Sequence, residues 1–479
     1  MEENELGTKI GLEIHVQLTC LKTKLFCGCS SNYRGKEPNT NLCPICMGLP
    51  GSLPVLNEKA VKVATLVSFA LSMHIQSRML FFRKNYYYPD MPKNFQITQY
   101  DQAGGVPFST NGKVVIEGPR QIRITRIQLE EDPARLVYEG TIDSSTATLV
   151  DYNRAGIALI EIVTEPDLRS PKDARVFLDK LKSIVESLGI SESSLEGSMR
   201  CDANISLKGG IRVEIKNISS FKEVERALNF EISRQKSLIE KGMKVKKETR
   251  HWDEVRRITV SLRTKEAEQD YRYFPEPDLV PIELSNEFLQ EIKCEMPELP
   301  EALQQRLIDQ YSISISNAKI LSENKDFAVY FEQCNKIYQS PVEISNWIVS
   351  DIIPSLSKKE ISLSKSQISP NSLCSLIRML KAGQLNRATA KRVLNESMET
   401  GKLPESIAKE QGLTKIVDRS QIERVINEVF EKNQPAVKDA IRNEDAIDFL
   451  VGLSMKATKG QADPKLINEI IREKLLEWS

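Results

Sequence analysis

The first half of the chain alternates apolar and polar residues over short runs. The runs IGLEIHVQL, RITRIQLEED, LIEIVTEP, RCDANISL and IRVEIKNI, between Lys9 and Pro281, have the period of two that is typical of β-strands. Two longer stretches repeat apolar residues at helical spacing, one from about Pro171 to Leu188 and one that follows Ser220 and ends near Gly242. This mixture predicts a sheet-rich α+β domain in which both helices have a packing role.

The second half of the chain has a helical pattern almost throughout. It begins after the proline-rich run FPEPDLVPIEL and is interrupted by Pro341, Pro354 and Pro370. A last block from about Gly412 reads as a small helical bundle. We therefore predict three domains: an α+β domain over residues 1–290, an all-α domain over 291–411 and a small α-helical tail domain over 412–479.

The composition of the chain mainly excludes certain classes of protein. Lys plus Arg and Asp plus Glu each number 66, so a nucleic-acid partner would need a local basic surface. The start MEENELGTKI lacks a basic segment followed by an apolar run, and no stretch of about 18 uninterrupted apolar residues occurs. We expect a soluble cytoplasmic protein with no membrane contact.

The polar members of four predicted strands suggest a site. If these strands share one sheet, residues two apart point to one face, which would combine carboxylates, cations and a histidine. Such a face suits Mg2+ and a phosphoryl group, although a solvated sheet face would show the same alternation. The residues are Glu13, His15 and Gln17, then Arg126, Gln128 and Glu130, then Arg200, Asp202 and Asn204, and finally Arg212, Glu214 and Lys216.

Four of the nine cysteines have the spacing of a metal site. Cys27, Cys29, Cys43 and Cys46 read C-x-C, then C-P-x-C after a gap of thirteen residues, which resembles a tetrahedral zinc knuckle. Four thiolates leave no open position, so we expect structural Zn2+ that staples the loop before a helix near Ala60. The alternative is a set of buried cysteines without a ligand.

An aromatic segment and two absent motifs also bear on function. FFRKNYYYPDMPKNFQITQYDQ, with Arg83 and Lys84 at its front, suits nucleotide or phosphate contacts, and it also suits a packed turn. No G-x-x-x-x-G-K-[ST] occurs, so ATP would not be held by a P-loop. No Ser-Ser-Lys amidase signature occurs either, so we expect that the chain does not hydrolyse glutamine itself.

Seven segments in order resemble the signature segments of a known family. They are GLEIHVQL, RKNYYYPDMPKNFQITQYDQ, RITRIQLEEDPARL, DYNRAGIALIEIVTEPDLRSP, EGSMRCDANIS, VEIKNISSF and DYRYFPEPDLVP. The chain is thereby similar to the B subunits of aspartyl/glutamyl-tRNA(Asn/Gln) amidotransferases. The resemblance implies a cradle-like catalytic domain that uses ATP to phosphorylate the side-chain carboxylate of misacylated Glu-tRNA(Gln) or Asp-tRNA(Asn). It also implies amidation by ammonia from a glutaminase of the amidase family, in a heterotrimer completed by a third, small protein.

The family's functional positions can be carried over to this sequence. Its Mg2+-binding catalytic positions fall on Glu13, His15, Glu130 and Glu214, and Glu131 replaces Glu130 if a bulge at EED exchanges their faces. We assign substrate or phosphate contact to Glu161, Arg200, Asp202, Lys216, Arg83 and Lys84. The tail would bind tRNA through Arg424, Lys432, Lys456 and Lys459. Two competing hypotheses are a non-catalytic tRNA-binding scaffold and a stand-alone enzyme that activates a small carboxylic acid.

Overall fold

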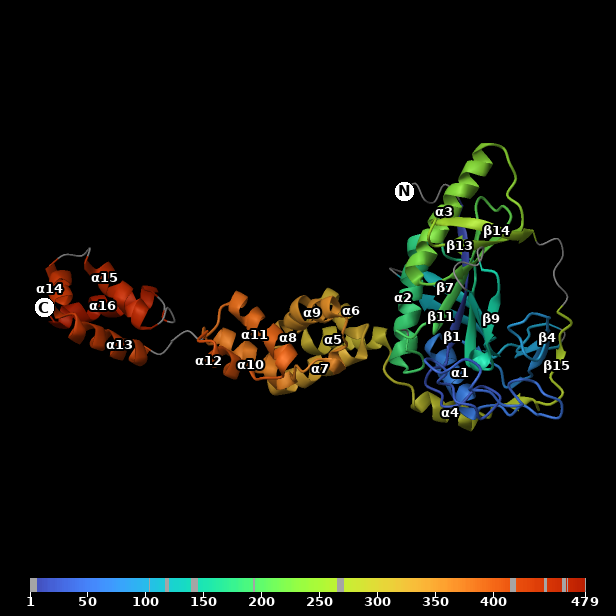
Figure 1. The fold of residues 1–479 in the computed structure, drawn as a ribbon, viewed down its shortest axis with the longest axis horizontal. Helices are drawn as coiled ribbons and strands as arrows, with labels where there is room; N and C mark the ends of the chain where they lie inside the picture. Colours follow the sequence, from blue (N-terminus) through green and yellow to red (C-terminus); the bar gives the residue numbers. More distant parts are fainter. Residues whose placement is uncertain are drawn as a thin grey trace. The chain divides into compact units, whose positions relative to one another are not determined.

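The structure is a computed structural model, and the chain divides into two compact units, Met1–Pro300 and Glu301–Ser479. It describes residues 7–102, 104–116, 120–138, 145–192, 194–264, 271–413, 419–442, 446–458, 462 and 464–478. Within these ranges, no helix is both long and apolar enough to cross a membrane. The first unit is rich in sheet and the second is helical, which confirms the α+β class (Figure 1).

A nine-stranded sheet forms the first unit, and its strand order differs from the sequence order. The neighbours are antiparallel except for the parallel pair β12 and β13. In spatial order the strands are β14 (Ile258–Thr264), β13 (Glu248–Asp253), β12 (Val213–Ile218), β11 (Met199–Ser206), β1 (Lys9–Gln17), β10 (Ala158–Thr164), β7 (Gln121–Glu131), β6 (Ser109–Val115) and β2 (His74–Ile75). The four polar runs predicted above therefore lie in one sheet, as expected.

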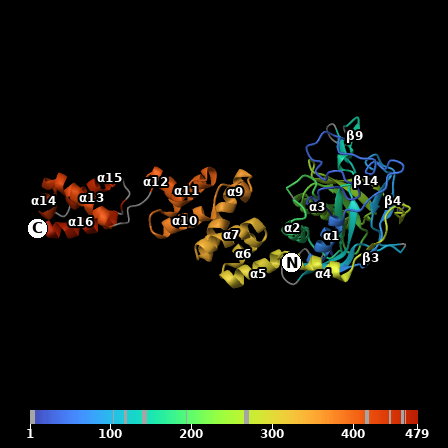
Figure 2. The ribbon, with the colours of Figure 1, turned by 90° about the horizontal axis from the view of Figure 1, so that it is seen from below.

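Helices cover the apolar face of this sheet. The helix α2 (Pro171–Ser187) packs against α3 (Phe221–Glu240), and α3 contacts β11, β12 and β14 (Figure 1). Both begin as predicted, because Ser170 and Ser220 each accept a hydrogen bond from the backbone N–H three residues later. Seen from below, α2 and the strand β4 (Phe82–Asn85) lie on opposite flanks of the unit (Figure 2). The helices α2 and α3 therefore pack together on one side of the sheet, and β4 lies on the other side of the unit (Figure 2).

Smaller elements surround the sheet. A three-stranded sheet has the order β15 (Phe274–Pro275), β4, β5 (Phe95–Thr98), and β5 contacts β7 of the main sheet. The remaining elements are α1 (Glu58–Ala70), the pair β8 (Arg135–Tyr138) and β9 (Thr148–Asp151), the pair β3 (Arg78–Met79) and β16 (Ile282–Glu283), the short helix Tyr152–Arg154 and α4 (Asn286–Cys294). The observed α1 agrees with the helix expected near Ala60.

The second unit contains two separate hydrophobic clusters. The first is built from α5 (Pro300–Tyr311), α6 (Ile315–Ser322), α7 (Lys325–Ile337), α8 (Pro341–Trp347), α9 (Ile353–Lys359), α10 (Pro370–Lys381), α11 (Arg387–Thr400) and α12 (Pro404–Glu410), with short helices at Ile348–Ile352 and Leu363–Lys365. The second is built from α13 (Arg419–Lys432), α14 (Gln434–Arg442), α15 (Ile447–Ala457) and α16 (Pro464–Trp478). The division of the chain at residues 290 and 411 remains a prediction.

Candidate active site on the polar face of the sheet

The polar side chains of five neighbouring strands share one face of the sheet. Strand register places Glu13 beside Asp202 and Val163, and places His15 beside Arg200 and Glu161. Directly opposite residues of antiparallel strands point to the same side, so these rows form one surface. We call it the polar face: Glu13, His15, Gln17, Arg126, Gln128, Glu130, Glu161, Arg200, Asp202, Asn204, Glu214 and Lys216.

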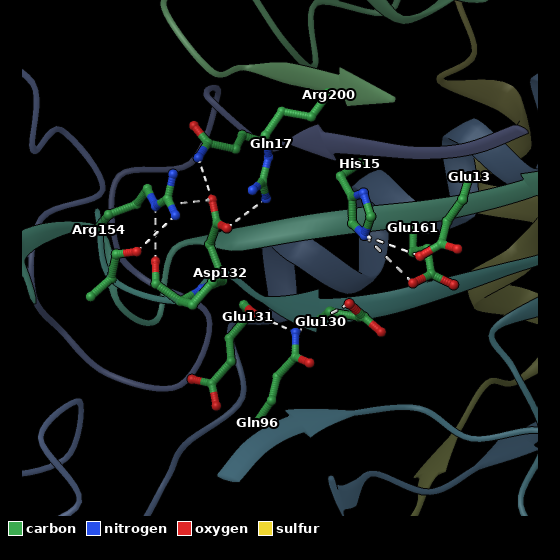
Figure 3. A network of polar contacts seen from close by, with 12 residues as sticks. Glu13, His15, Gln17, Gln96, Glu130, Glu131, Asp132, Arg154, Glu161 and Arg200 are labelled. Atoms are coloured by element: carbon green, nitrogen blue, oxygen red, sulfur yellow. Dashed lines mark hydrogen bonds and ion pairs between the residues drawn. The ribbon is translucent and has the colours of Figure 1, made fainter. Parts of the chain in front are cut away.

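The centre of the polar face is a compact group of Glu13, His15 and Glu161. Nε2 of His15 lies 3.8 Å from Oε1 of Glu13 and 3.6 Å from Oε2 of Glu161 (Figure 3). One donor atom from each of the three residues lies within 4.8 Å of the others. Two carboxylates and an imidazole at this separation are a donor set that fits a divalent cation.

The pKa values of the group show how closely the charges are held. Burial, then the charge of Glu161, raises the pKa of Glu13. Burial, then Glu161, also raises the pKa of Glu130 to about 7. Burial opposes ionisation of Glu161 too, but its hydrogen bond to His15 and that ring's charge lower its pKa to about 2. A divalent cation would relieve the repulsion among these carboxylates, so its binding would release protons.

Two of the expected metal-binding positions lie outside this compact group, on strands to either side of it. Glu130 on β7 accepts hydrogen bonds from Oγ1 of Thr98 at 2.5 Å and Nε2 of Gln96 at 3.2 Å. Glu214 on β12 accepts from Thr249 at 2.8 Å and pairs with Lys216 at 3.3 Å. Four strand spacings separate β12 from β7, so their backbones lie roughly 19 Å apart across the sheet. These two carboxylates share the face but do not meet at one point.

Glu131, the alternative to Glu130, points elsewhere. It forms an ion pair with Lys93 and accepts the backbone N–H of Ile97 at 2.8 Å. The register keeps Glu130 opposite Leu159 and Glu131 opposite Ala158, with no bulge between them. Glu130 is therefore the member of the pair on the polar face.

A buried carboxylate holds the other end of the polar face. Asp132 is 1% exposed and accepts from Nη2 of Arg200 at 2.7 Å and from Nε2 of Gln17 at 2.5 Å (Figure 3). Nε of Arg154 lies 3.8 Å from its Oδ2. Burial opposes ionisation of Asp132, but Arg200 and then Arg154 lower its pKa below the ordinary value. Asp132 thereby fixes the side chains of Arg200 and Gln17.

The remaining predicted contacts divide between the site and its surroundings. Lys216 pairs with Asp202 at 3.1 Å on the polar face. Burial of the Lys84 side chain opposes its protonation, but the negative charge of Glu130 raises the pKa of Lys84 above its ordinary value. Arg83 instead pairs with Glu276 at 2.7 Å and with Asp278 at 3.2 Å. The structure thus brings Lys84 to the site's edge and engages Arg83 in a separate ion pair.

Comparison with known proteins gives the family. The family model described as the GatB/GatE catalytic domain matches residues 8–290, and the model described as the GatB domain matches residues 329–475. The chain belongs to this family. The B subunit of the aspartyl/glutamyl-tRNA(Asn/Gln) amidotransferase of Saccharolobus solfataricus is 47% identical over 98% of this chain and 99% of that protein. The subunit of the same name from Thermotoga maritima is 45% identical over 98% of both chains.

The four predicted zinc ligands gather in this member of the GatB/GatE family. The Sγ atoms of Cys27, Cys29, Cys43 and Cys46 all lie within 4.8 Å of one another. The backbone N–H of Cys43 donates to Sγ of Cys46 at 3.1 Å. A hydrogen bond from Cys27 to the Cys46 sulfur lowers the pKa of Cys46 below its ordinary value. This donor set is compatible with Zn2+, and its structural role remains a prediction.

The tail residues are exposed where the structure describes them. Arg424 and Lys432 lie on α13, and Lys456 lies on α15. Lys432 pairs loosely with Glu428 at 3.9 Å. Lys459 lies outside the described residues. Their contact with tRNA remains a prediction.

Sequence reasoning missed Asp132 and Arg154 and left Glu161 outside the strand argument. The run LIEIVTEP has an alternating pattern that identifies a strand, but not the strand's place between β1 and β7. Asp132 follows β7 directly, and its burial beneath Arg200 depends on β11, far along the chain. No local signal could have shown these contacts.

Proposed function

We propose that this chain is the transamidating subunit of a tRNA-dependent amidotransferase. It would phosphorylate the side-chain carboxylate of Glu-tRNA(Gln), Asp-tRNA(Asn) or both with ATP, and then amidate it with ammonia. The relatives named above are B subunits of aspartyl/glutamyl-tRNA(Asn/Gln) amidotransferases, which supports this activity and an assembly with other subunits. The proposed partners are a glutaminase of the amidase family and a third, small protein, and glutamine is the proposed ammonia source.

The Glu13, His15 and Glu161 group is the observation on which the chemistry rests. A carboxylate is a poor acyl donor, and phosphorylation gives it a stable leaving group. Mg2+, held by these three residues with Glu130 nearby, would neutralise charge on the phosphoryl oxygens. Glu214 would act from its own end of the polar face, beside Lys216.

The cations around this group have distinct tasks in the proposed reaction. Arg126 lies 3.7 Å from Glu161 and 3.3 Å from Asp101, so it is held at the β7 side of the group. Arg200, fixed by Asp132, stands on the β11 side. We assign both guanidinium groups to the orientation of anionic oxygens of the substrates. Lys84 and Lys216 would balance developing charge from opposite sides of the face.

The competing scaffold hypothesis predicts a different result from the same variants. We expect Glu13→Ala with His15→Ala to abolish ATP-dependent amide formation on both misacylated tRNAs in the assembled complex, while tRNA binding persists. A non-catalytic scaffold would retain near-normal amidation. A stand-alone enzyme would instead turn over free glutamate or aspartate without tRNA. Absence of amide product with the wild-type complex would refute the proposal.

A further inference from the structure

A cleft opens at one end of the polar face because two strands diverge. Strand β10 pairs with β1 only as far as Val163, opposite Glu13. At the next position, Oγ1 of Thr164 accepts a hydrogen bond from the backbone N–H of Leu12 at 2.9 Å. The chain pairs with β1 again only at Leu168, which lies opposite Ile10. The arch between these points leaves a cavity of about 210 Å³ beside Gly11.

Gly11 on β1 is one of the residues that line this cleft. A Cβ built on Gly11 would lie 3.7 Å from the Cα atom of Pro166 and 3.7 Å from the carbonyl oxygen of Thr164, which is ordinary van der Waals contact. Gly11 also needs no left-handed backbone conformation. Alanine would therefore fit at position 11, where its methyl group would contact the backbone of Thr164 and Pro166 at the edge of the cleft.

The polar groups at this end differ in charge balance from those elsewhere on the face. Lys216, Arg200 and Arg126 all pair with carboxylates. Lys9 and Arg212, which line the cleft and are exposed, have no ion pair within the part of the chain that the structure describes. Lys9 and Arg212 are therefore two cations at this end of the polar face that are available to pair with an anion.

The order of groups along β1 indicates which anion the cleft fits. Lys9, Gly11 and Glu13 follow one another on one side of the strand, each about 7 Å from the next. Arg212 directly precedes β12, whose Glu214 lies beside Asn204 in the row of Gly11. Along β1, the outer cations Lys9 and Arg212 therefore come first, the cleft beside Gly11 comes next, and the candidate metal group at Glu13 comes last.

We propose that this cleft binds the 3′-terminal adenosine of the aminoacyl-tRNA. The 5′-phosphate of that nucleotide would meet Arg212 and Lys9, its nucleoside would lie over Gly11 beside the Asn204 amide, and its esterified ribose would point toward Glu13. ATP in the same cleft would send its phosphates toward the metal group and leave the outer cations without an anion. The assignment rests on the proposed function and adds the direction from which tRNA enters.

The test compares Arg212→Ala and Gly11→Ala with wild type in the assembled complex. We expect Arg212→Ala to raise the KM for misacylated tRNA about tenfold and leave the KM for ATP unchanged. The slope of log KM against log salt should fall by about 0.7, the share of one single-strand phosphate contact. Gly11→Ala should raise the same KM without lowering the melting temperature. Arg256→Ala is the matched control and should behave as wild type. Arg256 follows the end of β13, whereas Arg212 precedes the start of the parallel neighbour β12, so the two arginines lie at opposite ends of this strand pair.

Each outcome has one meaning. An unchanged KM for tRNA in both variants, with wild-type activity intact, would overturn the cleft assignment and leave the proposed function standing. A rise in the KM for ATP alone would also overturn it, because the cleft would then hold the nucleoside triphosphate. A wild-type complex that forms no amide would refute the proposed function itself.

Discussion

Replacement of Asp132 by asparagine tests whether the buried carboxylate organises the polar face. Asparagine keeps the shape of the side chain but removes the charge and turns one acceptor into a donor. Asp132 accepts from Arg200 at 2.7 Å and from Gln17 at 2.5 Å, so one of these donors loses its acceptor and the other bond weakens. Hydrogen bonds to charged groups contribute about 1.5–3 kcal/mol each.

We expect the substitution to lower the free energy of unfolding by about 3 kcal/mol. This is the lower end of the summed contribution of the two hydrogen bonds, because water can partly solvate the freed guanidinium group. The side chain of Arg200 is 37% exposed, which permits that solvation. With an m-value of about 3 kcal/mol/M, the urea midpoint should fall by about 1 M. Since Arg200 would also lose its fixed orientation, we expect weaker amidation by the assembled complex.

The assay must report on the first unit alone. The chain has three tryptophans, and Trp252 is the buried one in the first unit. In a background with Trp347→Phe and Trp478→Phe, urea unfolding followed by fluorescence would monitor that unit. Asp179→Asn is the matched control, because Asp179 pairs with Arg175 on the surface of α2 and should cost about 0.5 kcal/mol or less. Equal midpoints for Asp132→Asn and this control would refute the reasoning.

The remaining predictions concern the metal sites and pH. We expect one zinc ion per wild-type chain, which Cys46→Ser should lose and the control Cys20→Ser should keep. Metal analysis of the purified proteins measures this content, and wild-type protein without zinc would contradict the site. Glu161→Gln should raise the Mg2+ concentration for half-maximal amidation at least about tenfold, whereas Glu165→Gln should not, and an unchanged Mg2+ requirement would remove Glu161 from the ligand set. Burial opposes ionisation of Glu248, but a serine hydrogen bond and two arginines lower its pKa below the ordinary 4.5. A lowered folded pKa contributes stability above the unfolded value and loses it as pH falls through the folded value. The stability difference between wild type and Glu248→Gln in urea should therefore shrink from about pH 6 to about pH 3, and a constant difference would contradict this.

The sequence by itself determined the local features. Alternation placed Glu13 and His15 on one side of a strand, helical spacing and serine caps fixed α2 and α3, and cysteine spacing marked the thiol cluster. These features depend on neighbours within a few residues, so a single chain segment contains the information for them.

Only the tertiary structure decided which distant segments became neighbours. The insertion of β10 between β1 and β7 carried Glu161 to the centre of the candidate site, and kept Glu130 and Glu214 apart on the same face. The burial of Asp132 beneath Arg200 and the divergence of β10 from β1 at Thr164 arose in the same way. Strand order depends on which complete set of faces buries the most apolar area, and that choice belongs to the whole chain and not to any one strand.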